Sequence, residues 1–330
     1  MERTGTTLIR HLLTEKEPLT ALLTQISFGA KVISRELQRA GLVNLLGYTG
    51  EVNVQGEKVK KLDQWANEVF VEILKESRLV CTQVSEEMEE PLHFTEYCQD
   101  GSYLVCYDPI DGSSNTDING IVGTIFSVRR QRGKGADHVR SDALEKGTEQ
   151  VAAGYAMYGP GTMLVYTTGR SVNGFTLDPN TGEFLLSHPN IQIPKRGKTY
   201  SVNEGNYHHW HPQTRKYIDY LRQIDKGSGR PYSLRYVGSL VADLHRTLLE
   251  GGIYLYPADA DDPKKPTGKL RLLYEAAPLG FITEVAGGKA STGEKRILDI
   301  QPTSYHQRVP LIIGSAEDVT LAEDFYQGRR

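Results

Sequence analysis

Two carboxylates, a glycine and two hydroxyls stand together in the segment Asp108-Pro109-Ile110-Asp111-Gly112-Ser113-Ser114. The segment follows an apolar run at 103–107, which predicts a short buried strand. Carboxylate oxygens bind hard cations such as Mg²⁺, and the backbone N–H groups of a Gly-Ser-Ser turn can hold a phosphate. These residue types are also common in ordinary turns. If the segment is a functional site rather than an ordinary turn, it predicts phosphoryl transfer or phosphate hydrolysis.

A second acidic pair favours the site over the ordinary turn. The run at 79–84 predicts another strand, and it ends in Ser85-Glu86-Glu87. Ligands of open α/β sheets bind at the carboxyl ends of strands, so we expect the two acidic pairs to converge at one sheet edge. Two carboxylates at ~4 Å repel each other by several kcal/mol at an effective dielectric of about 20. Two or three Mg²⁺ would offset this repulsion, clamp the reacting oxygens and acidify a bound water.

The surrounding patterns predict an α/β protein with alternating helix and sheet layers. Helical spacing predicts helices at 22–37 and 62–73, on either side of a glycine-rich mobile loop at 47–56. The later expected elements are strands at 122–128, 151–158, 163–168, 174–178, 252–256 and 309–313, and helices at 217–222, 240–250 and 270–286. We expect the charged stretch 129–150 to be an exposed insertion loop. A boundary near residue 190 would give two adjoining α/β halves, 1–190 and 191–330.

Composition restricts the class of protein. The 330-residue chain has a net charge of −3, which gives no electrostatic case for nucleic acid or an acidic membrane. No run approaches the roughly 18 apolar residues of a membrane span, and no signal-peptide pattern follows Met1. We expect a soluble cytoplasmic protein, in which Cys81 and Cys106 are buried free thiols.

Further residues could complete the site. Glu275 lies four residues after Arg271, so on a helix the two form either a surface ion pair or part of the metal site. The candidates for holding a second phosphate are Asn203, Arg235, Tyr236, Tyr256 and Lys269, which offer an amide, a guanidinium fork, hydroxyl donors and a point charge. The chain has no G-x-x-x-x-G-K-[ST] motif, so an ATP-driven reaction has no support.

Over nearly its whole length the chain resembles class I fructose-1,6-bisphosphatase. The segments that carry the resemblance include 60–63, 84–87, 108–115, 123–126, 151–155, 203–205, 235–239, 251–257 and 269–275. The D-P-x-D-G-[ST] motif alone marks the wider lithium-sensitive phosphatase superfamily, and the later segments narrow the resemblance to the sugar bisphosphatase.

The resemblance implies Mg²⁺-dependent hydrolysis of the 1-phosphate of fructose 1,6-bisphosphate, in gluconeogenesis, by a homotetramer that uses two to three Mg²⁺ per subunit, with Mn²⁺ or Zn²⁺ as other possible metals. The implied metal ligands are Glu86, Glu87, Asp108, Asp111, Glu275 and the carbonyl of Ile110. Asp63 and Glu87 would activate the attacking water, and Glu57 in the loop would help to close the site. The implied substrate contacts are Asp111, Gly112, Ser113 and Ser114 for the 1-phosphate, Asn203, Tyr236 and Tyr256 for the 6-phosphate, Arg235 from a neighbouring subunit, and Lys269 for the sugar.

Some positions depart from the family pattern. Asn206 replaces the Tyr of animal relatives, and Ala277 stands where an Asn usually precedes the Pro. The AMP inhibitor site is matched at Thr20, Tyr103 and Arg130, but Ser102 replaces a phosphate-binding Lys. Loss of that contact costs about 1–3 kcal/mol, or roughly 10–100-fold in affinity. We therefore expect weak or absent AMP inhibition.

Three alternatives remain open. Sedoheptulose-1,7-bisphosphatase activity, alone or in addition, fits the same phosphate contacts. An inositol-phosphate phosphatase would leave Arg235, Tyr236 and Lys269 without a second phosphate to bind. A non-catalytic sugar-phosphate sensor predicts a broken metal set, whereas every ligand position here is filled.

Overall fold

The computed structural model describes residues 5–15, 18–43, 45–52, 58–98, 101–133, 135–260 and 268–330. Its α-helices are α1 (Leu8–Leu12), α2 (Leu19–Leu37), α3 (Lys61–Glu76), α4 (Ala136–Ala143), α5 (Pro212–Arg222), α6 (Leu240–Glu250), α7 (Ala277–Val285) and α8 (Ala316–Tyr326). Its strands are β1 (Tyr48–Val52), β2 (Lys58–Lys60), β3 (Val80–Ser85), β4 (Leu92–His93), β5 (Tyr103–Asp111), β6 (Val122–Arg130), β7 (Gln150–Tyr158), β8 (Thr162–Thr167), β9 (Val172–Asp178), β10 (Glu183–His188), β11 (Thr199–Ser201), β12 (Ser233–Leu234), β13 (Ile253–Tyr256), β14 (Leu270–Arg271), β15 (Lys289–Ser291), β16 (Arg308–Val309) and β17 (Leu311–Gly314). Short helical turns are η1 (Thr95–Tyr97), η2 (Ser113–Ile118), η3 (Gly147–Glu149), η4 (Glu204–His209), η5 (Lys226–Ser228), the π-helical η6 (Leu272–Ala276) and η7 (Ile297–Asp299).

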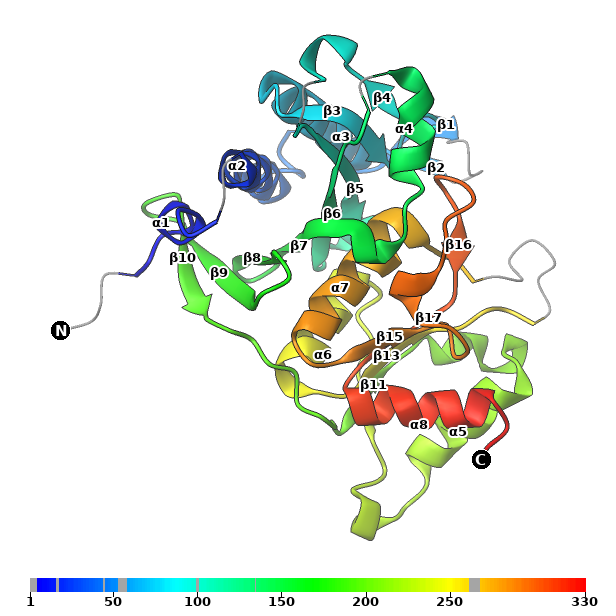
Figure 1. The fold of residues 1–330 in the computed structure, drawn as a ribbon. Helices are drawn as coiled ribbons and strands as arrows, with labels where there is room; N and C mark the ends of the chain where they lie inside the picture. Colours follow the sequence, from blue (N-terminus) through cyan, green and yellow to red (C-terminus); the bar gives the residue numbers. More distant parts are fainter. Residues whose placement is uncertain are drawn as a thin grey trace.

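Helix and sheet layers alternate through the molecule (Figure 1). The larger sheet has the order β10-β9-β8-β7-β6-β5-β3-β4, and a five-stranded sheet has the order β12-β11-β13-β17-β15. Helices α1, α2 and α3 cover one face of the larger sheet, α6 and α7 lie between the two sheets, and α5 and α8 cover the outer face of the smaller one. The predicted α/β class with layered helices and sheets is confirmed.

The first layer forms because α2 and α3 are amphipathic. The predicted apolar residues of α2, including Leu22, Ile26 and Ile33, are buried, and they share a core with Ala66 and Phe70 of α3 and with the larger sheet. Burying such side chains stabilises a fold by about 1.5–3 kcal/mol each. The two helices therefore hold one face of the strands that carry the acidic pairs.

The side chains of β13 alternate between the two faces of the smaller sheet, and this alternation positions the helices on both sides of it. Tyr254 faces α6 and α7, whereas Ile253 and Leu255 face α5 and α8. This period of two is expected for a strand that is covered on both faces. The middle helices thus lie between two sheets, and the N-terminus of α6 reaches the end of β5.

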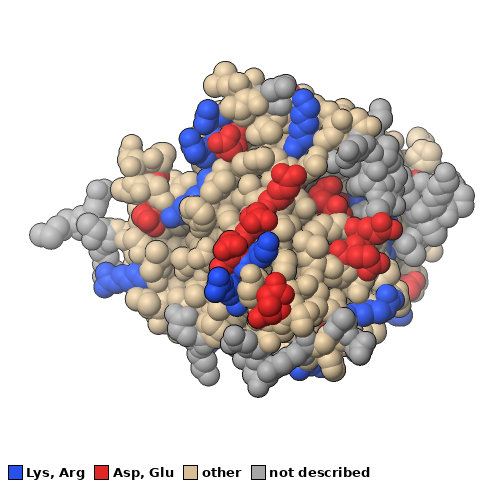
Figure 2. Space-filling view, turned by 90° about the horizontal axis from the view of Figure 1, so that it is seen from above, with Lys and Arg blue, Asp and Glu red and all other residues tan. Residues whose placement is uncertain are grey.

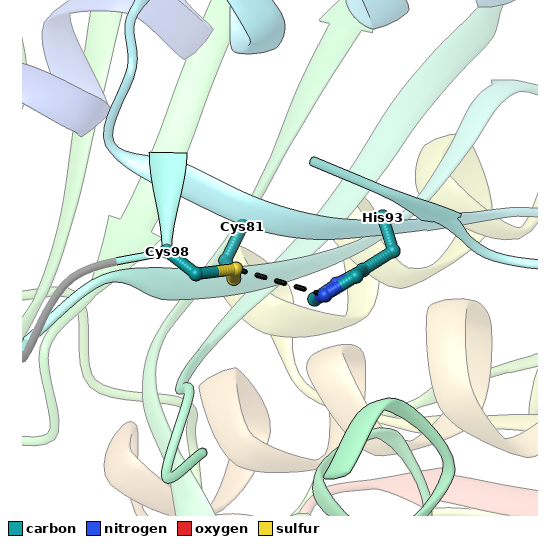
Figure 3. A group of neighbouring side chains, drawn as sticks. All are labelled: Cys81, His93 and Cys98. Atoms are coloured by element: carbon teal, nitrogen blue, oxygen red, sulfur yellow. Dashed lines mark hydrogen bonds between the residues drawn. A yellow bond between two sulfur atoms is a disulfide. The ribbon is translucent and has the colours of Figure 1, made fainter. Parts of the chain in front are cut away.

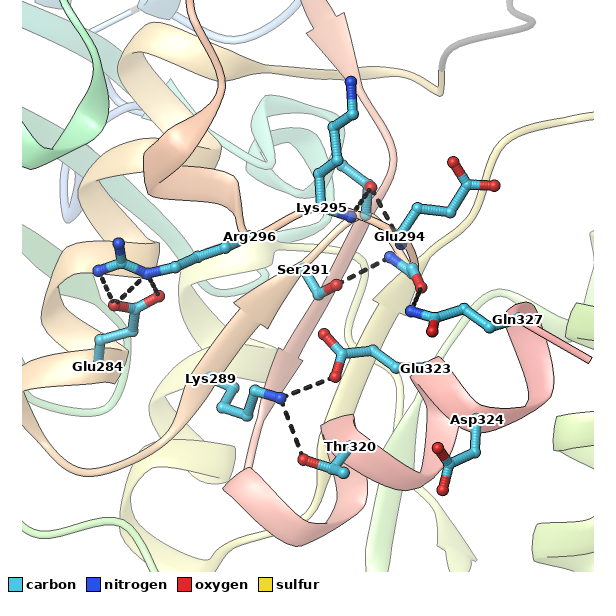
Figure 4. Close-up of polar contacts among 12 residues, drawn as sticks. Glu284, Lys289, Ser291, Glu294, Lys295, Arg296, Thr320, Glu323, Asp324 and Gln327 are labelled. Carbon is cyan, nitrogen blue, oxygen red and sulfur yellow. Dashed lines mark hydrogen bonds and ion pairs between the residues drawn. The ribbon is translucent and has the colours of Figure 1, made fainter. Parts of the chain in front are cut away.

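Surface ion pairs connect α8 and α7 to neighbouring segments (Figure 4). Lys289 Nζ of β15 lies 2.7 Å from Glu323 Oε2 of α8, and Arg296 Nη2 lies 2.6 Å from Glu284 Oε2 of α7. Exposed pairs of this kind contribute only about 0–1 kcal/mol. The buried core, rather than these pairs, therefore holds the C-terminal helix.

Three sequence-based expectations about elements are wrong. The stretch 129–150 is not an exposed loop, because Ala143 of α4 and the adjoining Leu144 pack into a small core. Arg129 is also fully buried and donates to the carbonyls of Glu145 and Lys146. Part of the predicted loop 47–56 is strand β1, paired antiparallel with β2; the rest, 53–56, lies outside the described residues.

The third wrong expectation is the helix at 270–286. The segment begins as β14, paired with β16, and continues as the π-helical η6 before α7 starts at Ala277. A distant strand partner therefore fixes the start of this segment, and its own apolar spacing does not.

The expectation of free thiols is wrong for Cys81. Cys81 of β3 forms a disulfide with Cys98, and Cys106 is a buried free cysteine. The linked residues are 17 apart and enclose the turn that carries Glu86 and Glu87.

Reduction of this disulfide is expected to lower the free energy of unfolding by about 3 kcal/mol, because the link removes loop entropy from the unfolded chain. Urea unfolding with and without a phosphine reductant measures the difference. A Cys106→Ser variant retains the disulfide and should show the same response to the reductant. An unchanged urea midpoint in the wild-type chain would contradict the prediction.

The face of the molecule seen in Figure 2 carries acidic and basic side chains close to one another, with no broad patch of either sign among its described residues. This mixture agrees with the small net charge of −3. Among the described helices, none combines the length and the apolar character needed to cross a membrane.

Candidate metal and phosphate site

A cavity of about 440 Å³ gathers most of the residues that the sequence singled out. The predicted residues that line it are Asp63, Glu86, Glu87, Asp108, Ile110, Asp111, Gly112, Ser113, Ser114, Asn203, Tyr236, Tyr256, Lys269 and Glu275. Arg235 is exposed and its guanidinium donates to the Leu234 carbonyl at 2.8 Å, outside this lining. Glu57 lies outside the described residues.

The two acidic strand ends meet because β3 and β5 are parallel neighbours. Ser85, the last residue of β3, pairs with Tyr107, and the N–H of Glu86 donates to the Tyr107 carbonyl at 3.1 Å. Glu86 and Asp108 therefore follow paired positions at one sheet edge. The predicted convergence of the two pairs is confirmed.

Three carboxylates form the centre of the cavity. One oxygen from each of Asp108, Asp111 and Glu275 lies within 4.8 Å of the others, and all three residues are buried. Asp108 Oδ1 accepts the Ile110 N–H at 3.0 Å, which fixes the turn that presents Asp111. Glu275 comes from the π-helical η6, a local irregularity that often occurs at functional sites.

The N-terminus of α6 holds Asp111. Its Oδ2 accepts the Ser239 hydroxyl at 2.7 Å and the Val241 N–H at 2.8 Å, and its Oδ1 accepts the Leu240 N–H at 3.2 Å. Helix N-termini favour negative charge, so these contacts stabilise the ionised carboxylate. Sequence reasoning did not single out Ser239, although a serine directly before an apolar helix is a recognisable N-cap.

Arg271 joins two of the acidic groups, a role that the sequence did not indicate. Its Nη1 lies 2.8 Å from Glu86 Oε1, and its backbone N–H donates to Glu275 Oε2. Of the two interpretations that the spacing left open, the surface ion pair on a helix is therefore excluded, because Arg271 is a buried strand residue. One guanidinium and one amide thus orient carboxylates from both halves of the sequence.

The acidic centre is short of positive charge. Burial, with the nearby Glu86 and Glu275, raises the pKa of Asp108 well above its usual range. Burial raises the pKa of Asp111 to about 6 against the opposing bonds from α6, and it raises the pKa of Glu275 to about 8 although Arg271 opposes the rise. A buried set of hard oxygen ligands with this charge deficit fits a divalent cation of the Mg²⁺ type.

Asp63 occupies the first turn of α3 beside this centre. Its side chain is buried, and burial together with repulsion from Glu87 raises its pKa to about 8. Ser113 hydrogen-bonds to it, while Oδ1 has no hydrogen-bond partner within the described part of the chain. Asp63 lines the cavity, but this Oδ1 is buried away from solvent, so its missing hydrogen bond adds to the cost of ionising the side chain.

Gly112 allows the turn between the metal ligands and the phosphate cradle. Its φ is +76°, and a Cβ there would lie 2.6 Å from the Ser239 Cβ. The following Ser113 and Ser114 begin η2 and line the cavity, and the first N–H groups of a helical turn have no partner within it. Gly112 therefore permits the close approach of this turn to the N-cap of α6.

Gly112→Ala is expected to destabilise the fold by about 1–3 kcal/mol and to disturb the Asp111–Ser239 bond. Gly182→Ala is the matched control, because Gly182 has φ +69° but nothing within 4 Å of its added Cβ. Thermal unfolding and phosphatase assays of both variants separate backbone strain from the clash. Equal losses in both would show that the approach to Ser239 is unimportant.

A second region of the cavity carries two phenol hydroxyls, an amide and an amine. Tyr236, Tyr256, Asn203 and Lys269 line it. Asp243 of α6 fixes the loop that holds Tyr236. Its carboxylate accepts the N–H groups of Val237 at 3.0 Å and Gly238 at 3.1 Å. These donors are suited to an anionic group at some distance from the carboxylates.

The candidate AMP-site residues lie in the first half of the chain. Tyr103 and Arg130 are paired across β5 and β6, with the guanidinium carbon 4.5 Å from the ring centroid. Thr20 of α2 is buried and its hydroxyl donates to the Leu12 carbonyl at 2.8 Å. Weak AMP inhibition stays a prediction.

Comparison with known proteins agrees with this fold and cavity. Residues 8–189 match the family model "Fructose-1-6-bisphosphatase, N-terminal domain", and residues 193–327 match the model "Fructose-1-6-bisphosphatase, C-terminal domain". A protein of Trichormus variabilis named fructose-1,6-bisphosphatase class 1 is 51% identical, over 99% of this chain and 94% of that protein. One of Chloroherpeton thalassium with the same name is 55% identical, over 94% of this chain and 88% of its own length.

Solved structures give the same result. The crystal structure of Leishmania major fructose-1,6-bisphosphatase in holo form matches with a TM-score of 0.92 and 44% identity, covering 98% of this chain and 99% of that one. Its T-state structure matches with a TM-score of 0.88 and 42% identity, covering 99% and 100%. The layered fold is therefore that of a sugar phosphatase. The chain belongs to the class 1 fructose-1,6-bisphosphatase family.

Proposed function

We propose that this chain hydrolyses the 1-phosphate of fructose 1,6-bisphosphate with divalent metal ions, Mg²⁺ first among them. The observation that carries the proposal is the single cavity in which a buried carboxylate cluster, a Gly-Ser-Ser turn and a second set of phosphate donors meet. The names of relatives about 50% identical over nearly the whole chain support the same substrate.

The carboxylates Glu86, Glu87, Asp108, Asp111 and Glu275, with the Ile110 carbonyl, would hold two to three ions per subunit. When bound, the ions would supply Lewis-acid stabilisation of phosphate charge and a more acidic water. The turn 112–114 would orient the departing phosphate with backbone N–H groups. Arg271 would keep Glu86 and Glu275 aligned for this task.

The proton and the substrate would be handled by separate residues. Asp63 and Glu87, which both line the cavity, would orient the attacking water and take up its proton. Asn203, Tyr236 and Tyr256 would hold the 6-phosphate, and Lys269 would contact the sugar. Because Arg235 is exposed and does not line the cavity of its own chain, we propose that it serves a neighbouring subunit in a homotetramer.

Phosphate release from a panel of substrates tests the proposal. With Mg²⁺, fructose 1,6-bisphosphate should be hydrolysed with a kcat/KM at least ~100-fold above that for inositol monophosphate, which leaves the second phosphate pocket unpaired. Sedoheptulose 1,7-bisphosphate in the same panel decides whether the enzyme accepts both sugars. Equal turnover of inositol monophosphate, or unchanged turnover in excess EDTA, would contradict the proposal.

A further inference from the structure

Two cysteines and a histidine cluster at the end of β3 opposite to the acidic pair. Cys81 lies near the start of β3, His93 lies in β4, and Cys98 follows η1. One ligand atom from each lies within 4.8 Å of the others. Cys81 and Glu86 are five strand residues apart, or about 16 Å, so this cluster is separate from the carboxylate cavity.

The imidazole is aimed at the sulfur atoms. His93 Nε2 lies 3.8 Å from Cys98 Sγ, and Figure 3 shows the ring pointing at the disulfide. The other ring nitrogen, Nδ1, is 3.0 Å from the Thr82 hydroxyl. A hydrogen bond to one ring nitrogen that leaves the other facing two sulfurs is the arrangement found around metal-binding histidines.

The chemistry of the three groups favours a borderline or soft metal. Thiolate and imidazole ligands select ions such as Zn²⁺, whereas carboxylates and carbonyls select Mg²⁺. Two thiolates would neutralise the charge of one divalent ion, so burial of the site would leave no net charge uncompensated. Three protein ligands leave one position of a tetrahedral ion for water.

We propose that, once the disulfide is reduced, Cys81, His93 and Cys98 form a Zn²⁺ site that disulfide formation abolishes. A dithiol reductant transfers two electrons and two protons to the S–S bond, which becomes two thiols while the reductant becomes a disulfide. Binding of Zn²⁺ then displaces the two thiol protons. Reoxidation by oxidised glutathione moves two electrons from the two thiolates to that disulfide, which becomes two glutathione thiolates, while the Cys81–Cys98 bond forms again and the ion is released.

The position of the cluster connects this site to the catalytic residues. The segment from Cys81 to Cys98 contains Glu86 and Glu87 and is closed at the same two ends by the disulfide or by the ion. The disulfide therefore closes this segment in the oxidised chain, and the bound ion would close it in the reduced chain. It does not depend on the proposed phosphatase activity, and it is tested without measuring turnover.

Cobalt binding to the full chain tests the proposal, because Co²⁺ replaces Zn²⁺ and its thiolate complexes absorb by charge transfer. The protein is reduced with a phosphine, desalted without oxygen and titrated in excess Mg²⁺, which occupies the carboxylates. We expect one equivalent per chain with a thiolate band in the reduced protein and none in the oxidised protein. Competition with Zn²⁺ should remove the band.

Variants locate the band. Cys98→Ser should abolish it, and Thr82→Val should weaken the affinity for the ion by about 10–100-fold through the loss of ring orientation. Cys106→Ser is the matched control, because this buried thiol lies on β5 outside the cluster and should leave the band intact. His93→Gln, at a partly exposed position, provides a second ligand variant if Cys98→Ser does not fold.

Two outcomes overturn the proposal. One is a reduced wild-type chain that shows no thiolate band at saturating Co²⁺. The other is a Cys106→Ser variant that loses the band as completely as Cys98→Ser does. Either result leaves the phosphatase proposal unaffected, because the carboxylate cavity shares no residue with this cluster.

Discussion

Asp108→Asn is expected to lower kcat by roughly 10³-fold or more while the protein stays folded. The substitution keeps the shape of the side chain and removes one negative charge from the carboxylate centre, where it would hold the metal beside the transferring phosphate. Phosphate release at saturating Mg²⁺ measures the loss. A variant with wild-type turnover would rule out a metal role for Asp108.

The stability of the same variant should move in the opposite direction. Burial and neighbouring carboxylates disfavour the charged form of Asp108, so a neutral amide relieves repulsion when no metal is present. In EDTA at pH 8 we therefore expect the variant to be at least as stable as the wild type. A variant that is less stable than the wild type under these conditions would contradict this prediction.

Asp142→Asn is the matched control for a buried carboxylate outside the cavity. Asp142 accepts a hydrogen bond from the Gln131 amide at 2.7 Å and another from the Arg132 N–H at 2.9 Å. The substitution should cost only a little stability, because the amide oxygen can still accept both hydrogen bonds but without the assistance of a negative charge. Turnover per folded molecule should remain at the wild-type level, so the pair of variants separates folding from catalysis.

The acidic site could be predicted from the sequence because it depends on local order. Each acidic pair directly follows an apolar run, so the local sequence predicts that Glu86 and Asp108 stand at the carboxyl ends of strands. Neighbouring parallel strands place these ends at the same edge of a sheet. The convergence also depends on β3 and β5 being parallel neighbours, which is a feature of the fold.

The parts that the sequence did not reveal depend on contacts between distant segments. Arg271 looked helical because Glu275 is four residues away, but pairing of β14 with β16 makes it a strand residue that reaches Glu86. Arg129 looked exposed because its neighbours are charged, yet two backbone carbonyls accept from its buried guanidinium. Such partners lie far along the chain or on the backbone, where residue type gives no signal.

The disulfide between Cys81 and Cys98 could not be predicted from the sequence for a related reason. A count of three cysteines gives no connectivity, and reducing conditions were the natural expectation for a chain without a signal-peptide pattern. The antiparallel pairing of β4 with β3 brings Cys98 back to Cys81. The approach of Cys98 to Cys81 therefore depends on the position of the chain reversal after Glu87, which a count of cysteines does not give.

The free energy of unfolding of the metal-free chain is expected to fall by several kcal/mol between about pH 5 and pH 8. Asp63 and Glu275 have folded pKa values raised to about 8, and Asp111 has one raised to about 6, above unfolded values near 4. Between those values the folded chain binds more protons than the unfolded chain does. Stability is therefore lost as pH rises through the folded pKa values.

Divalent metal should cancel this slope, because a bound cation replaces the protons as the partner of the carboxylates. Urea unfolding in EDTA and in saturating Mg²⁺, at pH 5, 6, 7 and 8, measures both curves. Calorimetry of Mg²⁺ binding at pH 7 in buffers of different ionisation enthalpy should show proton release from the protein. Asp108→Asn should reduce both the slope and the number of protons released, whereas Asp142→Asn should change neither. A metal-free stability that rises between pH 5 and pH 8 would contradict the assignment of these protons to the carboxylate centre.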